Sequence, residues 1–395
     1  MKRLVTRRTG VVAAALAAIV LLVGACGNST SAGGGGEALA DAAPITIGVS
    51  TVATGPLAIN DQVTKGLGAY FAYRNANGGI DGRKVELDVV DSAGTVAGGT
   101  SSVRQLLASK PFGLFVLSTA PFTGAQSVLK SDPTTPVFVL ANGSLVEAAG
   151  LPNAFGMFTD YTTESFVGIK TLADQGKKKI ALVYDPTIGE DAAKNAPAEA
   201  AKYGAEIVDV PLPATTTNFA PIAQSIVASG ADGIVFQVVA QSIAGTMKAV
   251  QNAGRPLPAV SYSGQLNATT LELGGAALEG MYFSALFPLV TDPSPAVQEF
   301  SREIAKLAPD AATVLGILGW NTGAMIEQAV KDADAAGPLT QESFMTALRG
   351  LGGKQVGVLE KVGWTQDVVT SIDAGKTDVF SLYQVRDGQF VKVGS

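Results

Sequence analysis

One strand–helix–strand pattern, from Ile45 to Val90, constrains the fold of this 395-residue chain more than any other stretch. A short run rich in branched residues, Ile45–Ser50, opens it. A second run, Lys84–Val90, closes it and alternates between polar and apolar residues before its apolar end. Such runs predict β-strands. Between them, apolar residues recur at helical spacing in Asn60–Asn77. A strand, a crossover helix and a second strand predict one unit of a parallel sheet.

The loop after the first predicted strand is the first place to expect ligand contacts. Ligands of parallel α/β sheets lie beyond the carboxyl ends of the strands. That end is the loop Thr51–Ile59, and Thr54 is its candidate binding residue. The helix that follows ends at Gly78-Gly79, because glycine enters the left-handed region without steric cost.

The N-terminus has the layout of a bacterial secretory signal. Four basic residues within the first eight positions precede an uncharged run, residues 9–25. The run ends Gly24-Ala25-Cys26, which looks like a lipobox, so we expect a signal peptide, 1–25, and a diacylglycerol on Cys26. The alternative is an uncleaved anchor with an incidental cysteine. The pair Arg7-Arg8 leaves twin-arginine export open beside the general secretory route.

Composition and net charge limit the classes of partner that this chain can have. Residues 26–43 are rich in Gly, Ser and Ala and predict a flexible tether. Without the four basic residues of the signal, 24 Lys and Arg stand against 34 Asp and Glu, a net charge of about −10. That balance argues against a nucleic-acid partner and against a surface that lies on anionic lipid. Membrane contact is expected through the lipid anchor only.

The chain has few side chains of the types that usually carry out catalysis. There is no histidine, and lipidation would consume the one cysteine. The usual general base, the commonest metal ligand and a thiol nucleophile are therefore missing. Gly-x-Ser-x-Gly and phosphate-loop motifs are absent as well. We expect a protein that is not an enzyme and that carries no cofactor, metal or disulfide.

Polar residues follow two further predicted strands. The strand Phe112–Leu117 is followed by a loop, Ser118–Gly124, and the strand Val137–Leu140 by Ala141–Ser144. Small hydroxyl and amide groups can donate hydrogen bonds without filling a cleft, and a helix N-terminus adds N–H groups suited to an anion. The alternative is that they are turn and cap residues. The candidates are Ser118, Thr119, Thr123, Asn142 and Ser144.

The same alternation starts again after an irregular crossing, 155–161, and predicts a second doubly wound sheet. Expected strands are 179–184, 206–210, 233–238, 259–262 and 281–285, with helices at 163–175, 190–203, 219–228 and 241–253. Helices at 295–307, 311–335 and 341–348 follow, then strands at 358–362, 379–385 and 390–393. The fold class is thus α/β. Polar residues near the strand ends are the second set of ligand candidates, with exposed loop residues as the alternative: Asp160, Tyr161, Asp185, Thr187, Gln241, Tyr262 and Gln265.

The segment Asn77–Leu87, together with Thr54-Gly55-Pro56, resembles the first crossover of the branched-chain-amino-acid (Leu/Ile/Val) type of ABC-transporter solute-binding proteins. That resemblance implies a type I periplasmic binding protein fold, with two lobes joined by a three-crossing hinge. Lobe 1 would comprise 44–157 and 288–355, and lobe 2 would comprise 158–287 and 356–395. It also implies that Thr123, Asn142 and Ser144 bind the carboxylate end of a ligand.

The chain departs from the amino-acid binders of that group at positions that matter for the ligand. Tyrosines of those proteins are replaced at Ile59-Asn60, at Ile188 and near Val239, and no carboxylate stands near Gly264-Gln265 to bind an ammonium. A buried ammonium without a counter-charge costs several kcal/mol. Either Asp160 or Asp185 supplies the charge, or the ligand is an amide, a carboxylate or an aromatic acid.

The function that the resemblance implies is that of an extracytoplasmic receptor, lipid-anchored to the bacterial cell membrane. It would capture a small polar molecule between two closing lobes and deliver it to an ABC permease, as a monomer. One alternative is a ligand-sensing lipoprotein of the same fold that acts on a signalling partner. Another is a hydrolase that works with Asp160 and Asp185. Ligand and permease identity stay open.

Overall fold

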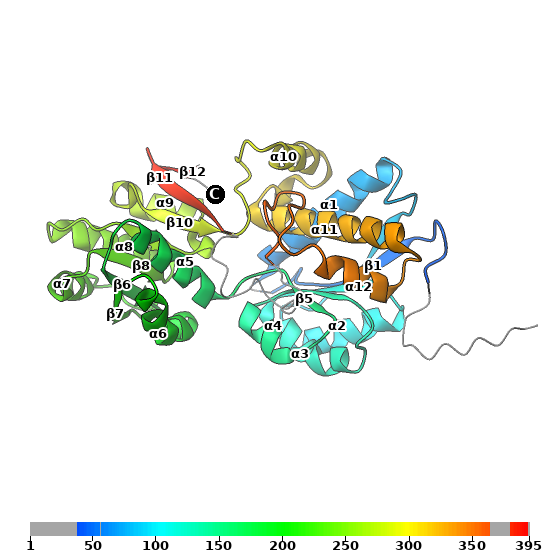
Figure 1. The fold of residues 1–395 in the computed structure, drawn as a ribbon, viewed down its shortest axis with the longest axis horizontal. Helices are drawn as coiled ribbons and strands as arrows, with labels where there is room; N and C mark the ends of the chain where they lie inside the picture. Colours follow the sequence, from blue (N-terminus) through cyan, green and yellow to red (C-terminus); the bar gives the residue numbers. More distant parts are fainter. Residues whose placement is uncertain (1–37, 56, 364–379, 394–395) are drawn as a thin grey trace, which may run out of the picture. The chain divides into compact units, whose positions relative to one another are not determined.

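The computed structural model describes residues 38–55, 57–363 and 380–393. The predicted signal peptide, Cys26 and most of the tether lie outside the described residues. Figure 1 gives the course of the chain, in which strands and helices alternate through both halves. The α/β class and the two parallel-stranded sheets predicted from the sequence are confirmed. Within the described residues, no helix combines the length and the apolar character that a membrane span requires.

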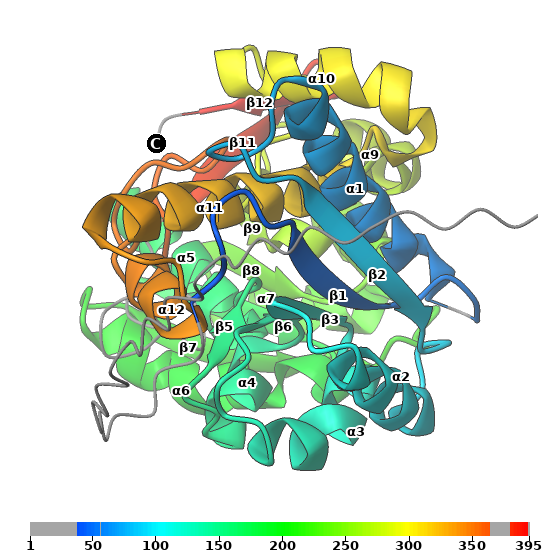
Figure 2. The ribbon, with the colours of Figure 1, turned by 90° about the vertical axis from the view of Figure 1, so that its right-hand side faces the viewer.

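Five parallel strands form the first sheet, in the order β2-β1-β3-β4-β5. They are Ile45–Thr51 (β1), Val85–Asp91 (β2), Gly113–Leu117 (β3), Val137–Leu140 (β4) and Ala154–Gly156 (β5). The helices grouped around this sheet are Asp61–Ala76 (α1), Val96–Ala108 (α2), Thr119–Lys130 (α3), Gly143–Ala149 (α4), Pro295–Leu307 (α10), Val314–Ala336 (α11) and Gln341–Arg349 (α12). Figure 2 shows α1 and α11 on one side of the sheet and α2, α3 and α4 on the other.

Strand β3 shows why this sheet is covered on both faces. Successive side chains of a strand point to opposite faces. Leu114 and Val116 therefore pack in one apolar cluster with α2, α3 and α4, whereas Phe115 and Leu117 pack in another with α1, α11 and α12. All four are fully buried. A strand buried on both faces is apolar throughout, as expected for a parallel sheet.

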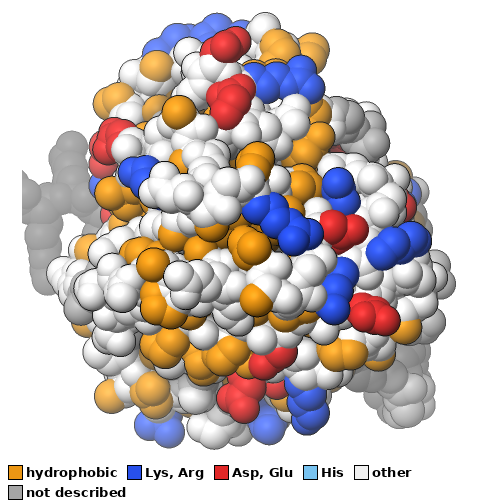
Figure 3. All heavy atoms as spheres, turned by 90° about the vertical axis from the view of Figure 1, so that its left-hand side faces the viewer, with side chains coloured by type: hydrophobic (Ala, Val, Ile, Leu, Met, Phe, Trp, Pro, Cys, Tyr) orange, Lys and Arg blue, Asp and Glu red, His pale blue; other side chains and the backbone are white. Residues whose placement is uncertain are grey.

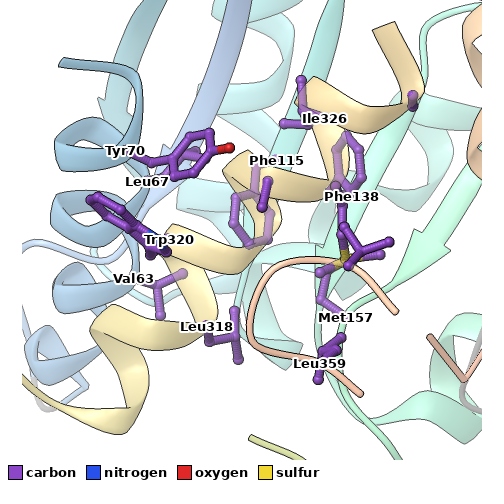
Figure 4. Close-up of a cluster of buried hydrophobic side chains, with 14 of the residues drawn as sticks. Val63, Leu67, Tyr70, Phe115, Phe138, Met157, Leu318, Trp320, Ile326 and Leu359 are labelled. Carbon is purple, nitrogen blue, oxygen red and sulfur yellow. The ribbon is translucent and has the colours of Figure 1, made fainter. Parts of the chain in front are cut away.

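Helices α1 and α11 pack backbone against backbone. A methyl group at Gly66 would overlap the carbonyl oxygen of Gly316, and one at Gly319 would overlap that of Val63. Figure 4 shows the side chains around this contact, with Leu67 from α1 and Leu318 from α11. Every fourth residue of α11 from Leu318 to Val330 is buried. The two helices, far apart in sequence, form one layer.

Trp320 fills the space beside that contact. Its ring lies edge-on to Tyr70 and Phe300, at centroid distances of 5.0 and 5.7 Å, and stacks on Tyr73 at 5.8 Å. Each such ring pair stabilises the fold by about 0.5–1.5 kcal/mol beyond the contribution of its buried area. Trp320 therefore packs in the core between α1, α10 and α11.

Seven strands form the second sheet, in the order β12-β11-β10-β9-β8-β6-β7. They are Lys179–Tyr184 (β6), Glu206–Pro211 (β7), Gly233–Gln237 (β8), Ala259–Ser261 (β9), Tyr282–Ala285 (β10), Ser381–Arg386 (β11) and Gln389–Lys392 (β12). The helices are Tyr161–Asp174 (α5), Pro186–Ala201 (α6), Ala220–Ser229 (α7), Ala240–Asn252 (α8) and Ala268–Gly274 (α9). Strands β6 to β10 are parallel, and the predicted C-terminal hairpin adds β11 and β12 as an antiparallel edge. Helices α5 and α6 cover one face, and α7 and α8 the other.

Helices begin earlier than the sequence pattern indicates. The expected loop Ser118–Gly124 is wrong, because α3 starts at Thr119, and α6 starts at Pro186 instead of near residue 190. A proline is tolerated in the first turn of a helix, where its missing N–H has no intrahelical partner. Pro121 and Pro186 therefore lie inside first turns.

Short elements and one strand differ as well. The sequence did not predict β5, α4 or α9, which are three to seven residues long and too short to show a period. The expected strand 358–362 is wrong. The backbone N–H of Val358 donates to Asn321 Oδ1 at 2.7 Å, and Val358, Leu359 and Val362 pack in the apolar cluster of β1 and α11. The lobe boundary expected at residue 355 stays a prediction.

Charge is mixed on the molecular surface. On the face shown in Figure 3, acidic and basic side chains are interspersed with apolar ones. No large area of that face carries one sign of charge among the residues drawn in colour. Strong steering of a charged macromolecule is therefore not expected from this face.

Two glycines on α1 give a direct test of the α1–α11 contact. We expect Gly66→Ala to lower the free energy of unfolding by more than 2 kcal/mol, since an overpacked helix contact costs about 1–3 kcal/mol or more. Gly68→Ala is the matched control, because its methyl group would lie 3.6 Å from Leu87 Cδ1 and alanine favours the helix by about 0.5–1 kcal/mol. Urea unfolding gives the free energy of unfolding of both variants. Equal changes in the two would contradict the α1–α11 packing described.

Candidate functional site

A hollow lies at the carboxyl edge of the first sheet, where the strand order reverses. In the order 2-1-3-4-5 the reversal falls between β1 and β3, and ligands of such sheets lie at that point. The hollow has a volume of about 680 Å³. Its polar lining comes from the segments after β1, β3 and β4: Asn60, Ser118, Thr119, Thr123 and Asn142. The structure thus brings together four of the six candidates predicted on this sheet.

The remaining walls of the hollow are apolar and uncharged. Leu57, Val96, Leu140, Phe158 and Leu315 contribute apolar side chains, and Tyr161 adds a phenol ring. Its other two lining residues are alanines, so no lining residue carries a formal charge at neutral pH. Any ligand charge must be balanced there by dipoles and hydrogen bonds.

Ser118, one of these lining residues, has a strained backbone conformation. Its φ of 76° and ψ of 151° fall in a region that is essentially restricted to glycine. Two contacts hold it: its N–H donates to the Leu140 carbonyl at 2.7 Å, and Asn60 Nδ2 donates to its hydroxyl oxygen at 2.6 Å. Strain of this kind costs about 1–3 kcal/mol and concentrates at functional sites.

The strained turn points the chain directly into α3. The first N–H groups of a helix lack intrahelical acceptors and favour a negatively charged or oxygen-rich group. The Thr123 hydroxyl donates to the Thr119 carbonyl at 2.9 Å, and Asn142 N–H approaches Thr119 Oγ1 at 3.5 Å. The Ser118 hydroxyl accepts from Asn60 and keeps its own proton to donate. The edge is therefore rich in donors.

Two candidates from the first sheet lie outside the lining. The Thr54 hydroxyl donates to Asp91 Oδ2 at 2.6 Å, so it joins the loop after β1 to the end of β2. Ser144 is exposed, and its N–H and hydroxyl both donate to Asn142 Oδ1, at 3.2 and 3.0 Å. For Ser144 the turn-and-cap role weighed in the sequence is the observed one. Ligand contact by either of them stays a prediction.

The second sheet reverses its order between β6 and β8, and Asp185 follows β6 there. Its Oδ1 accepts from the N–H and the hydroxyl of Thr187, at 2.8 and 2.6 Å, and its Oδ2 accepts from Ala214 N–H at 2.7 Å. The Thr187 hydroxyl is the main cause that lowers the pKa of Asp185, although burial opposes it. Asp185 is thus the N-cap of α6 and holds the loop after β7.

Asp160 has the same role on α5. Its two carboxylate oxygens accept from the N–H and the hydroxyl of Thr163, at 2.7 and 2.9 Å. It is 7% exposed. Both carboxylates that the sequence offered as counter-charges for a ligand are therefore occupied as helix caps, and their ligand contacts stay a prediction.

The aromatic candidates of the second sheet form one group. Tyr161 and Tyr262 meet edge to face at a centroid distance of 5.6 Å, and Gln265 Nε2 donates to the Tyr262 hydroxyl at 2.8 Å. Burial raises the pKa of both tyrosines, so each phenol stays protonated near neutral pH. Gln241 is exposed in the first turn of α8 and has no contact with this group among the hydrogen bonds of the described residues.

Sequence reasoning missed Glu164, which holds this edge together. Its carboxylate accepts from Ser263 N–H at 2.6 Å, from the Ser263 hydroxyl at 2.9 Å and from the Ser284 hydroxyl at 3.0 Å. It is 2% exposed, and burial raises its pKa to about 7. An acidic residue among the apolar positions of the predicted helix 163–175 was the signal that could have found it.

Gln237 was missed as well. This last residue of β8 is fully buried, and its Oε1 accepts from the Ser165 hydroxyl at 2.8 Å. Its side-chain N–H group has no partner within the described part of the chain. A buried polar group without a partner is costly, so its amide marks the reversal point of the second sheet as a place for a polar contact.

Comparison with known proteins decides the family. The family model described as periplasmic binding protein matches residues 44–389. The chain belongs to the periplasmic binding protein family. The resemblance carried by Asn77–Leu87 is thereby confirmed, and the family is extracytoplasmic.

Individual relatives of this periplasmic binding protein agree. It is 27% identical over 256 residues, 63% of this chain and 69% of the other, to "Leu/Ile/Val-binding protein homolog 3" of Brucella melitensis. A putative branched-chain amino acid ABC transporter structure from Rhodospirillum rubrum matches 89% of this chain and all of its own, at 19% identity and a TM-score of 0.75. A fatty acid ABC transporter substrate-binding protein from Thermomonospora curvata matches 91% of this chain and 93% of its own, at 18% identity and a TM-score of 0.65. The names of these relatives describe binding proteins or ABC transporters.

The strain at Ser118 can be measured by comparing glycine with alanine. We expect Ser118→Gly to be more stable than Ser118→Ala by about 1–2 kcal/mol, because glycine adopts this backbone region without strain. Exposed Ser127, inside α3, is the matched control. At this position the alanine variant should be more stable than the glycine variant by about 1 kcal/mol. Denaturant unfolding of the four variants gives the values. The same order at both positions would contradict the strain.

Glu164 should make stability depend on pH. Its raised pKa means that the folded state binds the proton more tightly than the unfolded state, so stability falls as pH rises from about 4.5 to about 7. The loss is of order 3 kcal/mol. Glu164→Gln keeps the shape of the protonated side chain. Its free energy of unfolding, compared with that of the wild type, should therefore rise from pH 5 to pH 8. Thermal unfolding at both pH values tests this, with exposed Glu86→Gln as control. A difference that does not change with pH would contradict it.

Proposed function

We propose that this protein is the solute-binding component of an ABC importer and that the hollow at the β1–β3 reversal is its ligand site. The single observation that carries the proposal is the donor-rich, uncharged lining around strained Ser118. The strain costs free energy, and a chain retains such a cost where the conformation serves binding. Family membership supports the same reading.

The lining supports a mode of binding in which the ligand's acceptor group lies at the start of α3. The hydroxyls of Ser118 and Thr119 and the first N–H groups of α3 are the proposed donors, and Asn142 adds its side-chain amide. Such groups bind an oxygen-rich ligand head without needing a charged residue. The walls of Leu140 and Phe158 would receive the rest of the ligand.

The second sheet would close over the ligand. The carboxyl edge of this sheet offers the Gln237 side-chain N–H group, at the reversal point, and the Tyr161–Tyr262 pair. Contacts made only in the closed state would shift the equilibrium towards closure, and the closed form would dock on the permease. Ligand recognition and delivery would then share one conformational equilibrium.

The proposed location is the outer face of the cell membrane, with a lipid on Cys26. The chain enters the folded body at a fixed place: Leu39 N–H donates to the Leu339 carbonyl at 2.7 Å, and the buried Arg83 guanidinium donates to the Ala40 carbonyl at 2.5 Å. The α11–α12 loop, which contains Leu339, would then lie on the side of the folded body that the lipid anchor approaches.

A ligand screen tests the site. The mature chain with Cys26→Ser is heated with amino acids, amides, carboxylates, aromatic acids and short peptides. A ligand present at 100 times its dissociation constant should add about 2.7 kcal/mol to the free energy of unfolding. Thr119→Val should weaken that ligand about tenfold, the effect of one lost hydrogen bond of roughly 1.4 kcal/mol. The exposed Thr346→Val, on α12, is the control.

Two outcomes would overturn the assignment of the site or of the function. Equal affinity of Thr119→Val and the wild type for the ligand found would place the binding elsewhere. The importer function would be excluded if the ligand-loaded protein failed to stimulate, in proteoliposomes, the ATPase activity of the permease that is encoded beside it.

A further inference from the structure

We infer that the ligand is a carboxylate with an apolar body and no ammonium group, and not a zwitterionic amino acid. The inference rests on the proposed function, because it concerns the same site. It is carried by three features of the described residues: where exposed aliphatic side chains gather, which charges are missing, and which donors remain free.

Exposed aliphatic side chains gather at the carboxyl edges of the two sheets. Among the nine large apolar side chains that are exposed in the described residues, five lie just after strands β1, β2, β6 and β8. They are Leu57, Ile59, Val96, Ile188 and Val239, which are 36–57% exposed. Ile188 and Val239 follow the two strands of the second reversal point. Exposed apolar groups gathered at a binding edge indicate an apolar ligand surface.

The charges that an amino acid would need are missing. An α-ammonium taken out of water needs a counter-charge, and leaving it unpaired costs several kcal/mol. The lining of the hollow carries no formal charge, and the Asp160 and Asp185 carboxylates cap α5 and α6. The Glu164 carboxylate is buried and already accepts three hydrogen bonds from Ser263 and Ser284.

The free donors suit one carboxylate. Ser118 keeps its hydroxyl proton while its oxygen accepts from Asn60, and α3 begins immediately beside it. A lining that combines these donors with aliphatic side chains matches a molecule with one anionic head and an apolar body. A second charge on the ligand would find no charged partner in this lining.

Calorimetry with matched probes tests the inference on the mature protein. L-leucine is compared with 4-methylpentanoate, which lacks only the amino group, and with 3-methylbutylamine, which lacks only the carboxylate. We expect 4-methylpentanoate to bind at least tenfold more tightly than leucine, and the amine not to bind. In straight-chain acids each added methylene should tighten binding about fourfold, from ~0.8 kcal/mol per buried CH₂, until the hollow is filled.

Surface variants show whether the exposed aliphatic groups make the contact. Leu57→Asn should weaken octanoate binding about tenfold and leave the affinity for propionate nearly unchanged. Leu307→Asn is the matched control, because this leucine is similarly exposed, 45% against 49%, at the end of α10. Equal effects of the two variants would overturn the inference.

Other results separate this inference from the proposed function. Tighter binding of leucine than of 4-methylpentanoate would overturn the inference and leave the importer in place. Failure of every acid from four to ten carbons to bind would overturn it as well. In that case a hit of another class in the wider screen, with the Thr119→Val effect, would still support the site.

Discussion

The direct backbone contact between α1 and α11 is the constraint on which the rest of the first sheet depends. It joins a helix near the start of the folded body to one in its last quarter, at Gly66, Gly316 and Gly319. The contact fixes α1 against the sheet. Asn60, the N-cap residue of α1, is thereby held where its amide reaches Ser118 after β3. Packing of two helices thus determines the geometry of the turn that lines the hollow.

The electrostatics of the candidate site follow from what its carboxylates already do. Asp160 and Asp185 each start a helix on the second sheet, and capping of this kind contributes about 1 kcal/mol. Glu164 joins α5 to the loop after β9 and to β10. Negative charge is thus used to hold the edges of the sheet in place, and the hollow itself stays neutral. Neutral walls with directed donors favour a ligand whose one charge is negative.

Much of the fold could be predicted from local patterns, and much of the site could not. Strands such as Lys179–Tyr184 and Val137–Leu140 have the predicted bounds, because a buried parallel strand is apolar throughout. Helix starts were misplaced where a proline occupies the first turn, as at Pro121. The alternation at 358–362 does not form a strand, because Asn321 and the first core take up that segment. The backbone strain at Ser118 depends on Leu140 and Asn60, which no local pattern connects to it.

The sequence by itself determined the class of fold and the family, because these depend on hydrophobic period, on glycine and proline positions and on short motifs. It also determined which chemistry was missing, since composition alone excludes histidine and leaves one thiol. Only the tertiary structure decided which polar groups are free. Asp160, Asp185 and Thr54 look available in sequence, yet each is bonded to a neighbour, whereas Gln237 is buried with an unpaired amide. The reason is physical: a hydrogen bond is made between groups brought together by packing, and the sequence lists those groups without their distances.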